Sequence, residues 1–124
     1  MNYKGIIIEE SLENKEVLKD LKIIKTEVEP VTEKDKTPWL KNWTMHTVEI
    51  EEDKAEKIAE KISKSLEKEH NWYADFKNDK MHFIIFKNKI FHISRKKEEY
   101  EKVKKYGITI GIPDYQLDFS PDIK

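Results

Sequence analysis

The chain has 124 residues, of which 40% are charged and 37% are hydrophobic. Its 24 basic residues nearly balance its 25 acidic residues, which argues against a nucleic-acid clamp, because a clamp needs a basic patch. The sequence contains no cysteine, and this excludes disulfides, thiolate catalysis and thiolate metal sites. The length fits a single domain over residues 1–124 with one modest core.

The sequence shows no sign of an export or membrane segment. Its first residues, MNYKGIIIEE, lack the long hydrophobic stretch of a signal peptide, and no apolar run approaches the length of a membrane span. We therefore expect a cytoplasmic protein with no membrane partner. Arg95 is the only arginine, so arginine-mediated recognition of phosphates or bases is nearly excluded. We expect no nucleic-acid partner and no cofactor.

The first third of the chain predicts a strand, a short helix and a second strand. The β-branched run at residues 6–8 indicates a short buried strand. Residues 11–21 show a weak helical stripe, for which either Ser11 or Asn14 is suited as the N-cap. Residues 22–31 predict the second strand.

A polar loop and a third strand are predicted next. Residues 32–42 are polar apart from Trp39 and the leucine after it, and long ordered loops are often functional. Residues 43–52 indicate a strand, because side chains alternate between the two faces of a sheet. This alternation places His46 on one face and Trp43 on the other.

The clearest helix is predicted at residues 55–66. Apolar side chains recur there at helical spacing, and glutamates and lysines fill the remaining positions. Asp53 is the expected N-cap of this helix. The apolar positions are Ala55, Ile58, Ala59, Ile62 and Leu66.

Three strands in a meander are predicted after this helix. Asn78-Asp79 is expected to close the first hairpin as a two-residue turn, and residues 87–89 are expected to contain the second turn.

A C-terminal helix is predicted to begin near residue 96. Tyr100 and Val103 start a helical spacing that continues to Ile110, and Gly111 is a typical stop. In the alternative interpretation, an earlier glycine ends the helix and residues 108–112 form a strand. The remaining residues are expected to form a packed tail.

The turn at Asn78-Asp79 sorts the side chains of the meander into two faces. Counting outward from it places Asp75 directly opposite His82. One face is almost wholly apolar and should meet the helix at 55–66; it carries Trp72, Ala74, Phe76, Met81, Phe83 and Ile85. The other face carries Tyr73, Asp75, His82, Ile84 and Phe86.

The second turn decides which way the third strand of the meander faces. A two-residue turn at 87–88 or at 88–89 puts Phe91 and Ile93 on the Asp75 face, whereas a three-residue turn reverses the strand. The Asp75 face is therefore partly apolar and needs a cover. The C-terminal tail, the loop with Trp39 or a second subunit would supply it.

Asp75 and His82 are the candidate catalytic pair. A carboxylate that accepts a hydrogen bond from an imidazole orients it for proton transfer, with Tyr73 or His46 as an assisting group. The alternative interpretation is a cross-strand contact that stabilises the hairpin by less than about 1 kcal/mol.

The tryptophans suggest a second kind of site. Trp39, Trp43 and Trp72 are suited to line a pocket for a planar or apolar small molecule, with His46 as its polar contact. Asp75 and His82 belong to this candidate ligand site if all these groups converge. The alternative interpretation is packing in the core or at a subunit interface.

No metal site is predicted. The four histidines match no metal-binding signature, although His46 and His82 would meet if their strands lay side by side on one face. His70 is expected near the end of the helix at 55–66, where an imidazolium interacts favourably with the helix dipole.

The segments TPWLKNWTMHTVEI, HNWYADFKND and IPDYQLDF resemble a family of small, uncharacterised prokaryotic proteins. The resemblance spans most of the chain. It implies no activity, cofactor or catalytic residue.

The combined pattern predicts an α+β domain: a mainly antiparallel sheet with an amphipathic helix on one face, similar to a ferredoxin-like sandwich. The first functional hypothesis is a non-catalytic binding module that self-associates into a homo-oligomer through the second sheet face or the Trp39 loop. The alternatives are a small hydrolase or isomerase that uses Asp75 and His82, and a sensor with a small-molecule ligand in a pocket lined by tryptophan.

Overall fold

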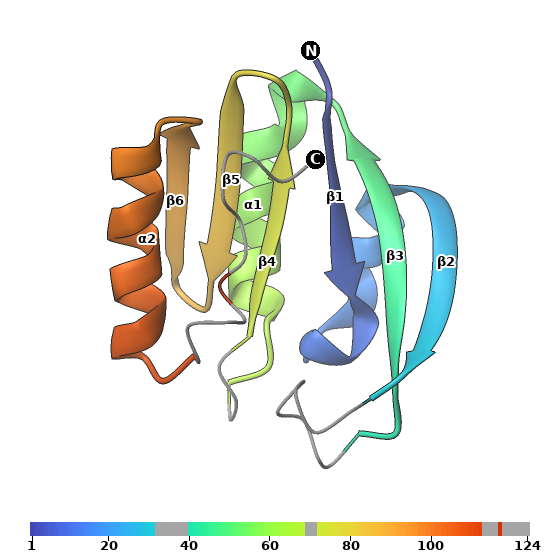
Figure 1. Cartoon of the computed structure of the whole chain (residues 1–124). Helices are drawn as coiled ribbons and strands as arrows, with labels where there is room; N and C mark the ends of the chain where they lie inside the picture. The colour runs from blue at the N-terminus through green and yellow to red at the C-terminus, as the bar shows by residue number, and fades with distance from the viewer. Residues whose placement is uncertain (32–39, 69–71, 113–116, 118–124) are drawn as a thin grey trace.

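A computed structural model describes residues 1–31, 40–68, 72–112 and 117. Within these residues the elements follow the predicted order of a strand, a short helix, two strands, a helix, three strands and a helix (Figure 1). The strands are β1 (Tyr3–Ile8), β2 (Lys22–Pro30), β3 (Asn42–Ile50), β4 (Tyr73–Lys77), β5 (Met81–Phe86) and β6 (Lys89–Ser94). The helices are the 3₁₀ segments η1 (Glu9–Ser11), η2 (Lys15–Asp20) and η4 (Glu52–Lys54), and the α-helices α1 (Ala55–Ser65) and α2 (Lys97–Thr109).

The described strands form one sheet in the order β2-β3-β1-β4-β5-β6, and each neighbouring pair is antiparallel. The elements from β1 to β4 follow the strand–helix–strand–strand–helix–strand order of ferredoxin-like folds. In this chain, 3₁₀ turns replace the first helix, and the hairpin β5-β6 extends the sheet beyond β4. The predicted α+β class is confirmed.

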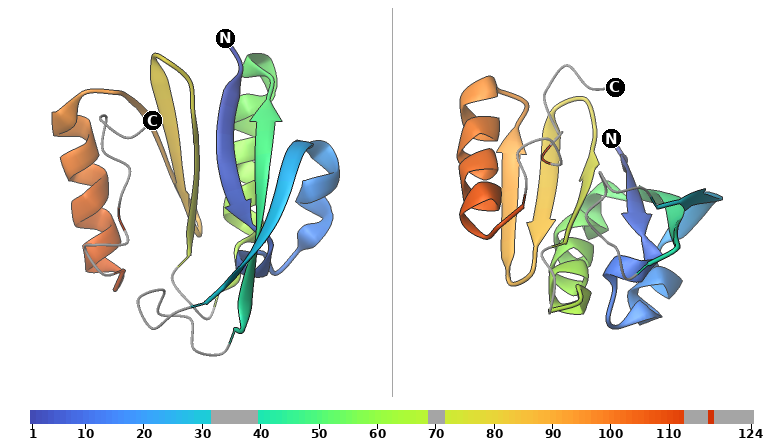
Figure 2. Two further views of the ribbon diagram at one scale, coloured as in Figure 1. Left: turned by 45° about the vertical axis from the view of Figure 1, so that its right-hand side comes forward. Right: turned by 60° about the horizontal axis from the view of Figure 1, so that its bottom comes forward.

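The sheet separates two hydrophobic clusters. α1 and η2 pack on one face and α2 packs on the other, as Figure 2 shows. The larger cluster lies under α1 and includes Ile7, Val48, Ile62, Leu66, Phe76 and Ile85. The smaller lies under α2 and includes Ile84, Phe86, Ile93, Tyr100, Val103, Ile112 and Leu117. The predicted sorting of the meander into an α1 face and a second face is therefore confirmed.

The predicted amphipathic helix is α1, and its apolar positions are all buried. Its predicted N-cap is wrong. The chain enters α1 through the 3₁₀ turn η4, which contains Asp53, so Lys54 occupies the cap position and makes no side-chain cap hydrogen bond.

The helix predicted at residues 11–21 is made of 3₁₀ turns. Of the two proposed caps, Asn14 is the N-cap of η2, where its side chain accepts a hydrogen bond of 3.0 Å from the Glu16 amide. The Ser11 hydroxyl instead donates to the Ile8 carbonyl.

The first hairpin turns one residue later than predicted. Asn78 and Met81 are joined by a backbone hydrogen bond, and the Asn78 side-chain oxygen accepts from the Lys80 and Met81 amides at 2.9 and 2.8 Å. The Asn78 side chain therefore holds the turn, as Asx side chains commonly do. Asp75 consequently lies opposite Ile84 instead of His82.

For the second hairpin and for the C-terminal helix, the structure decides between the two alternatives that the sequence left open. Phe86 pairs with Lys89 across a two-residue turn in which Asn88 has a φ of 60°. The strand alternative at 108–112 is wrong, because α2 continues through Gly107 to Thr109. A Cβ at Gly107 would lie 2.6 Å from Leu117, so this glycine leaves the space in which Leu117 packs.

Candidate functional site

Asp75, His82 and Tyr100 form a hydrogen-bonded chain across three elements. The Nε2 atom of His82 on β5 lies 2.7 Å from Oδ2 of Asp75 on β4, and its Nδ1 atom lies 2.8 Å from the hydroxyl of Tyr100 on α2. The predicted contact between Asp75 and His82 is present in spite of the changed register. A shift of two residues moves the partner along the strand and keeps it on the same face.

The hydrogen bonds around His82 have one consistent direction for the neutral tautomer that carries its proton on Nε2. An ionised carboxylate only accepts, so Nε2 of His82 carries the proton and donates to Asp75. Nδ1 then accepts, and the Tyr100 hydroxyl donates to it. Both ring nitrogens of His82, a residue with 0% exposed surface, are therefore satisfied.

The surroundings of this chain favour a protonated Tyr100. Burial raises the pKa of the Tyr100 phenol above its ordinary value of 10.0, and the charge and hydrogen bonding of Arg95 partly offset the rise.

The pKa of the neighbouring Lys77 is lowered by burial, and the positive charge of Arg95 lowers it further. Asp75 acts in the opposite direction on Lys77, because its negative charge favours the ammonium form.

Access to the chain is limited to its carboxylate end. His82 is fully buried and Tyr100 is 5% exposed, whereas the Asp75 side chain is 33% exposed. In hydrolases with a carboxylate–imidazole–hydroxyl triad, the hydroxyl must reach the substrate. Here the hydroxyl end is buried between α2 and the sheet, so the geometry is suited to fastening α2 onto β4 and β5.

Tyr73 and His46, the two groups predicted to assist the Asp75–His82 pair, lie in other surroundings. Tyr73 lies on the same face, but its ring packs against Phe86 at a centroid distance of 5.8 Å. His46 lies on the opposite face of the sheet. It pairs with Ile7 of β1, whereas Asp75 pairs with the preceding Ile6, and adjacent residues of a strand point to opposite faces.

His46 belongs to a second hydrogen-bonded chain. Its Nδ1 atom lies 2.8 Å from the Thr26 hydroxyl, and its Nε2 atom lies 3.0 Å from Oε1 of Glu9. The next glutamate, Glu10, accepts hydrogen bonds from the amide and hydroxyl of Thr44 at 2.6 and 2.8 Å. Together these contacts tie β2 and η1 to β3.

Two of the three tryptophans proposed to line a pocket contact each other. Trp43 and Trp72 pack edge to face with ring centroids 6.0 Å apart, and Trp72 belongs to the core under α1. Trp39 and His70 lie outside the described residues. A surface depression lined by Asn2, Glu51, Glu52 and Asp53 contains none of the predicted site residues.

Metal-ligating side chains do not gather in the described part of the chain. No three histidine, aspartate or glutamate side chains there lie close enough together to hold an ion. His92, the remaining histidine, stacks on Phe83 with a centroid distance of 3.9 Å.

Sequence reasoning did not single out Tyr100, Glu9 or Thr26 as site residues. Tyr100 carried a signal, since it begins the apolar spacing of α2 and its hydroxyl therefore enters a buried face. The contacts of Glu9 and Thr26 join residues separated by 37 and 20 positions, and no local pattern indicates them.

Comparisons of the chain with family models, curated proteins and solved structures found no match. The resemblance to a family of small prokaryotic proteins therefore stays a prediction. Among the described residues, no helix is both long enough and apolar enough to cross a membrane.

Proposed function

We propose that this protein is a non-catalytic interaction module that associates with a second copy of itself through the free edge of β2. The observation that carries the proposal is the exposure of this strand. All nine residues of β2 are exposed, and in the described sheet the strand has a neighbour, β3, on one side. The unpaired N–H and C=O groups of a sheet edge are a template for another strand.

The apolar residues of β2 support the same assignment. Ile23, Ile24 and Val28 are 41%, 50% and 62% exposed. β-branched side chains gathered on an edge strand gain free energy when a second strand covers them. A module that buries them against another copy would account for their presence in a chain that is otherwise rich in charge.

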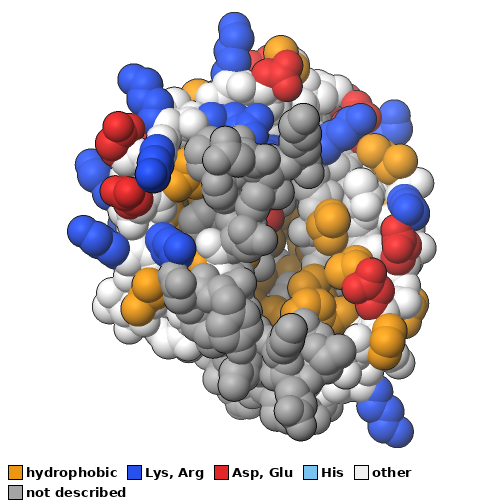
Figure 3. All heavy atoms as spheres, viewed as in Figure 1, with side chains coloured by type: hydrophobic (Ala, Val, Ile, Leu, Met, Phe, Trp, Pro, Cys, Tyr) orange, Lys and Arg blue, Asp and Glu red, His pale blue; other side chains and the backbone are white. Residues whose placement is uncertain are grey.

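The second sheet face, offered above as the surface for self-association, is less suited to that role. α2 covers this face over β4, β5 and β6 within the same chain. Exposed apolar surface on this face is confined to its other half: Figure 3 shows hydrophobic side chains over β1 and β3, and Ile6 of β1 is 50% exposed.

Acid–base catalysis receives less support from the geometry. Two of the three groups in the Asp75–His82–Tyr100 chain are buried, and the chain joins α2 to the sheet. A sensor with a tryptophan-lined pocket is also less supported, because Trp43 and Trp72 pack against each other.

Sedimentation of the wild-type protein from low micromolar to millimolar concentration tests the proposal. We expect the average mass to rise toward that of a dimer as the concentration increases. Ile24→Lys should weaken this association, whereas Ile108→Lys should not. The two isoleucines form a matched pair, because both are 50% exposed and Ile108 lies on α2. A monomer at every concentration would refute self-association.

A further inference from the structure

The side chains of β2 alternate in a pattern that limits how two copies of the strand can pair. Lys25 and Glu27 share one face, since they lie opposite Thr47 and Met45 of β3. Thr26 lies on the other face, opposite His46. Lys25 and Glu27 are exposed and in contact, with 2.5 Å between Nζ and Oε1.

Twofold symmetry restricts the registers further. In an antiparallel pair of identical strands, the residue at the symmetry axis faces itself, and residues equally far from it in opposite directions face each other. Because facing residues share a sheet face, each allowed register is defined by the one residue on the axis.

The registers around the middle of β2 differ in their charge pairs. An axis at Lys25 sets lysine against lysine. An axis at Glu27 sets Lys25 of each copy against Glu29 of the other, but it also sets glutamate against glutamate at its centre. An axis at Thr26 sets Lys25 of each copy against Glu27 of the other, with no like charges opposed. Opposite charges across a strand pair stabilise it, and like charges destabilise it.

The backbone of β2 also bears on the register. The pairing of β2 with β3 shifts between Ile23 and Lys25, so Ile24 lies outside the regular register with β3. Pro30, at the end of β2, has no N–H group to donate. An axis at Thr26 keeps Pro30 at the margin of the paired stretch, and it sets Ile24, at the irregular step, opposite Val28 of the second copy.

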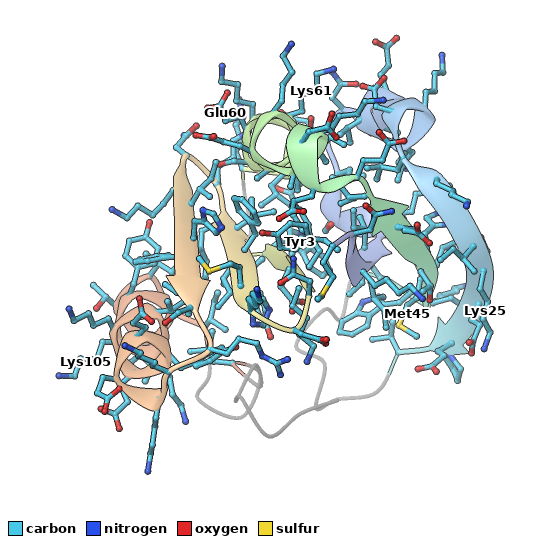
Figure 4. The ribbon with its side chains drawn as sticks, turned by 90° about the horizontal axis from the view of Figure 1, so that it is seen from above. Tyr3, Lys25, Met45, Glu60, Lys61 and Lys105 are labelled. Atoms are coloured by element: carbon cyan, nitrogen blue, oxygen red, sulfur yellow. The ribbon has the colours of Figure 1, made fainter. Side chains whose placement is uncertain are left out.

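We infer that two copies of this protein pair through β2 in the antiparallel register centred on Thr26, which joins their sheets into one continuous sheet. The inference rests on the proposed self-association and names its partner surface. Figure 4 shows Lys25 on the outer edge strand and Lys105 on α2, at the opposite side of the molecule. Because the shared stretch is short, the interface falls in the small class below about 1,200 Å², and the dimer is expected to be weak.

Charge-reversal variants test the pairing. Lys25→Glu and Glu27→Lys should each weaken dimerisation about tenfold, because two cross-strand pairs change from attraction to repulsion. An equimolar mixture of the two variants should recover dimerisation, since a carboxylate of one chain then faces an ammonium group of the other in both cross-strand pairs. Lys105→Glu, which makes the same change of charge on α2, should leave the dissociation constant unchanged. Sedimentation equilibrium measures all four samples.

Cysteine cross-linking tests the register. The chain has no native cysteine, so Lys25→Cys can be mixed with a mass-tagged Glu27→Cys chain under mild oxidation. The register centred on Thr26 predicts that mixed disulfides form faster than those between identical chains. Faster linkage between identical chains would overturn the register.

The outcomes separate this inference from the proposed function. If the wild-type protein stays monomeric, the proposed function fails and the inference fails with it. If the wild-type protein dimerises but neither charge reversal changes the dissociation constant, the edge pairing is wrong while self-association stands. Loss in both single variants without recovery in their mixture would also overturn the pairing.

Discussion

Each residue of the Asp75–His82–Tyr100 chain comes from a different element, so their hydrogen bonds act as a three-way junction between β4, β5 and α2. His82 is fully buried and depends on both partners to satisfy its ring nitrogens. A buried polar atom that loses its partner costs more free energy than the hydrogen bond itself contributes. The packing of α2 on the sheet is therefore expected to weaken when one hydrogen-bonding atom of this junction is removed.

Tyr100→Phe tests this sensitivity. The substitution keeps the buried ring and removes the hydroxyl that donates to His82, so we expect the free energy of unfolding to fall by about 1–3 kcal/mol. Tyr106→Phe is the matched control, because Tyr106 lies on the same helix as Tyr100 and its ring packs on Phe86 and Phe91 of the sheet. We expect that variant to stay within about 0.5 kcal/mol of the wild type. Urea denaturation measures both, and equal losses would contradict a special role for the hydroxyl.

At the residue scale, the sequence predicted contacts that depend on strand alternation. Asp75 and His82 meet because both lie on one face of a hairpin, and moving the two-residue turn by one position along the chain does not alter this. The sequence did not reveal that His46 lies on the opposite face. That placement depends on how β1 pairs with β3 on one side and with β4 on the other, and these pairings join distant parts of the chain.

Among the elements, β1 and β4 meet at the narrowest junction of the sheet. They pair over three residues, Lys4 to Ile6, and this junction joins the strands β2, β3 and β1 to the meander. Gly5 lies at its centre. A Cβ there would lie 2.1 Å from the Asp75 carbonyl oxygen and 2.7 Å from Cβ of Phe76, so the two strands approach as closely as glycine allows.

Gly5→Ala should separate β1 from β4. The added methyl group meets backbone that cannot move without shifting a strand, and we expect a loss of about 1–3 kcal/mol or more in the free energy of unfolding. Lys4→Ala, at the exposed neighbouring position, should change it by less than about 0.5 kcal/mol. Urea denaturation of both variants gives the comparison. An unchanged Gly5→Ala variant would show that the strands have room to move apart.

Helices with a regular spacing of apolar residues were predictable from the sequence. Elements whose form depends on distant contacts were less predictable. The spacing of α1 indicated both its extent and its buried face. The segment at 11–21 had a weak stripe and forms 3₁₀ turns. α2 continues through Gly107, and Leu117, from the segment after the helix, packs in the space that a Cβ would fill. This tertiary contact accounts for a glycine inside a helix, and helix propensity alone does not indicate it.

On the scale of the whole molecule, one sheet supports two cores of unequal size. α1 and η2 cover one face, where side chains from β1, β3, β4 and β5 form the larger core, and α2 covers the meander on the other face. The predicted need for a cover over the Asp75 face was justified, but the cover includes α2 of the same chain. The predicted order of elements was right. The strand order in space, which leaves β2 at an edge, could not be obtained from local patterns.

Salt should affect association more than folding. The net charge of −1 gives little overall repulsion, so raising the sodium chloride concentration should leave the free energy of unfolding nearly unchanged. The proposed dimer instead depends on opposed Lys25 and Glu27 side chains at an exposed edge, which salt screens. We expect its dissociation constant to rise with salt. Sedimentation and urea denaturation at low and high salt check both expectations, and a dimer that is insensitive to salt would argue for apolar contacts alone.

The turn held by Asn78 has a consequence for chain length. Since successive side chains of a strand point to alternate layers, two residues added to this loop would leave each ring and carboxylate of the hairpin in its present layer. An insertion that stays within the loop leaves the paired residues in place, whereas a one-residue slip of β5 along β4 would exchange the layers along a whole strand, with apolar side chains turned toward α2 and the imidazole toward α1. The Asn78 turn therefore matters because it fixes the register, and added loop length alone would cost little.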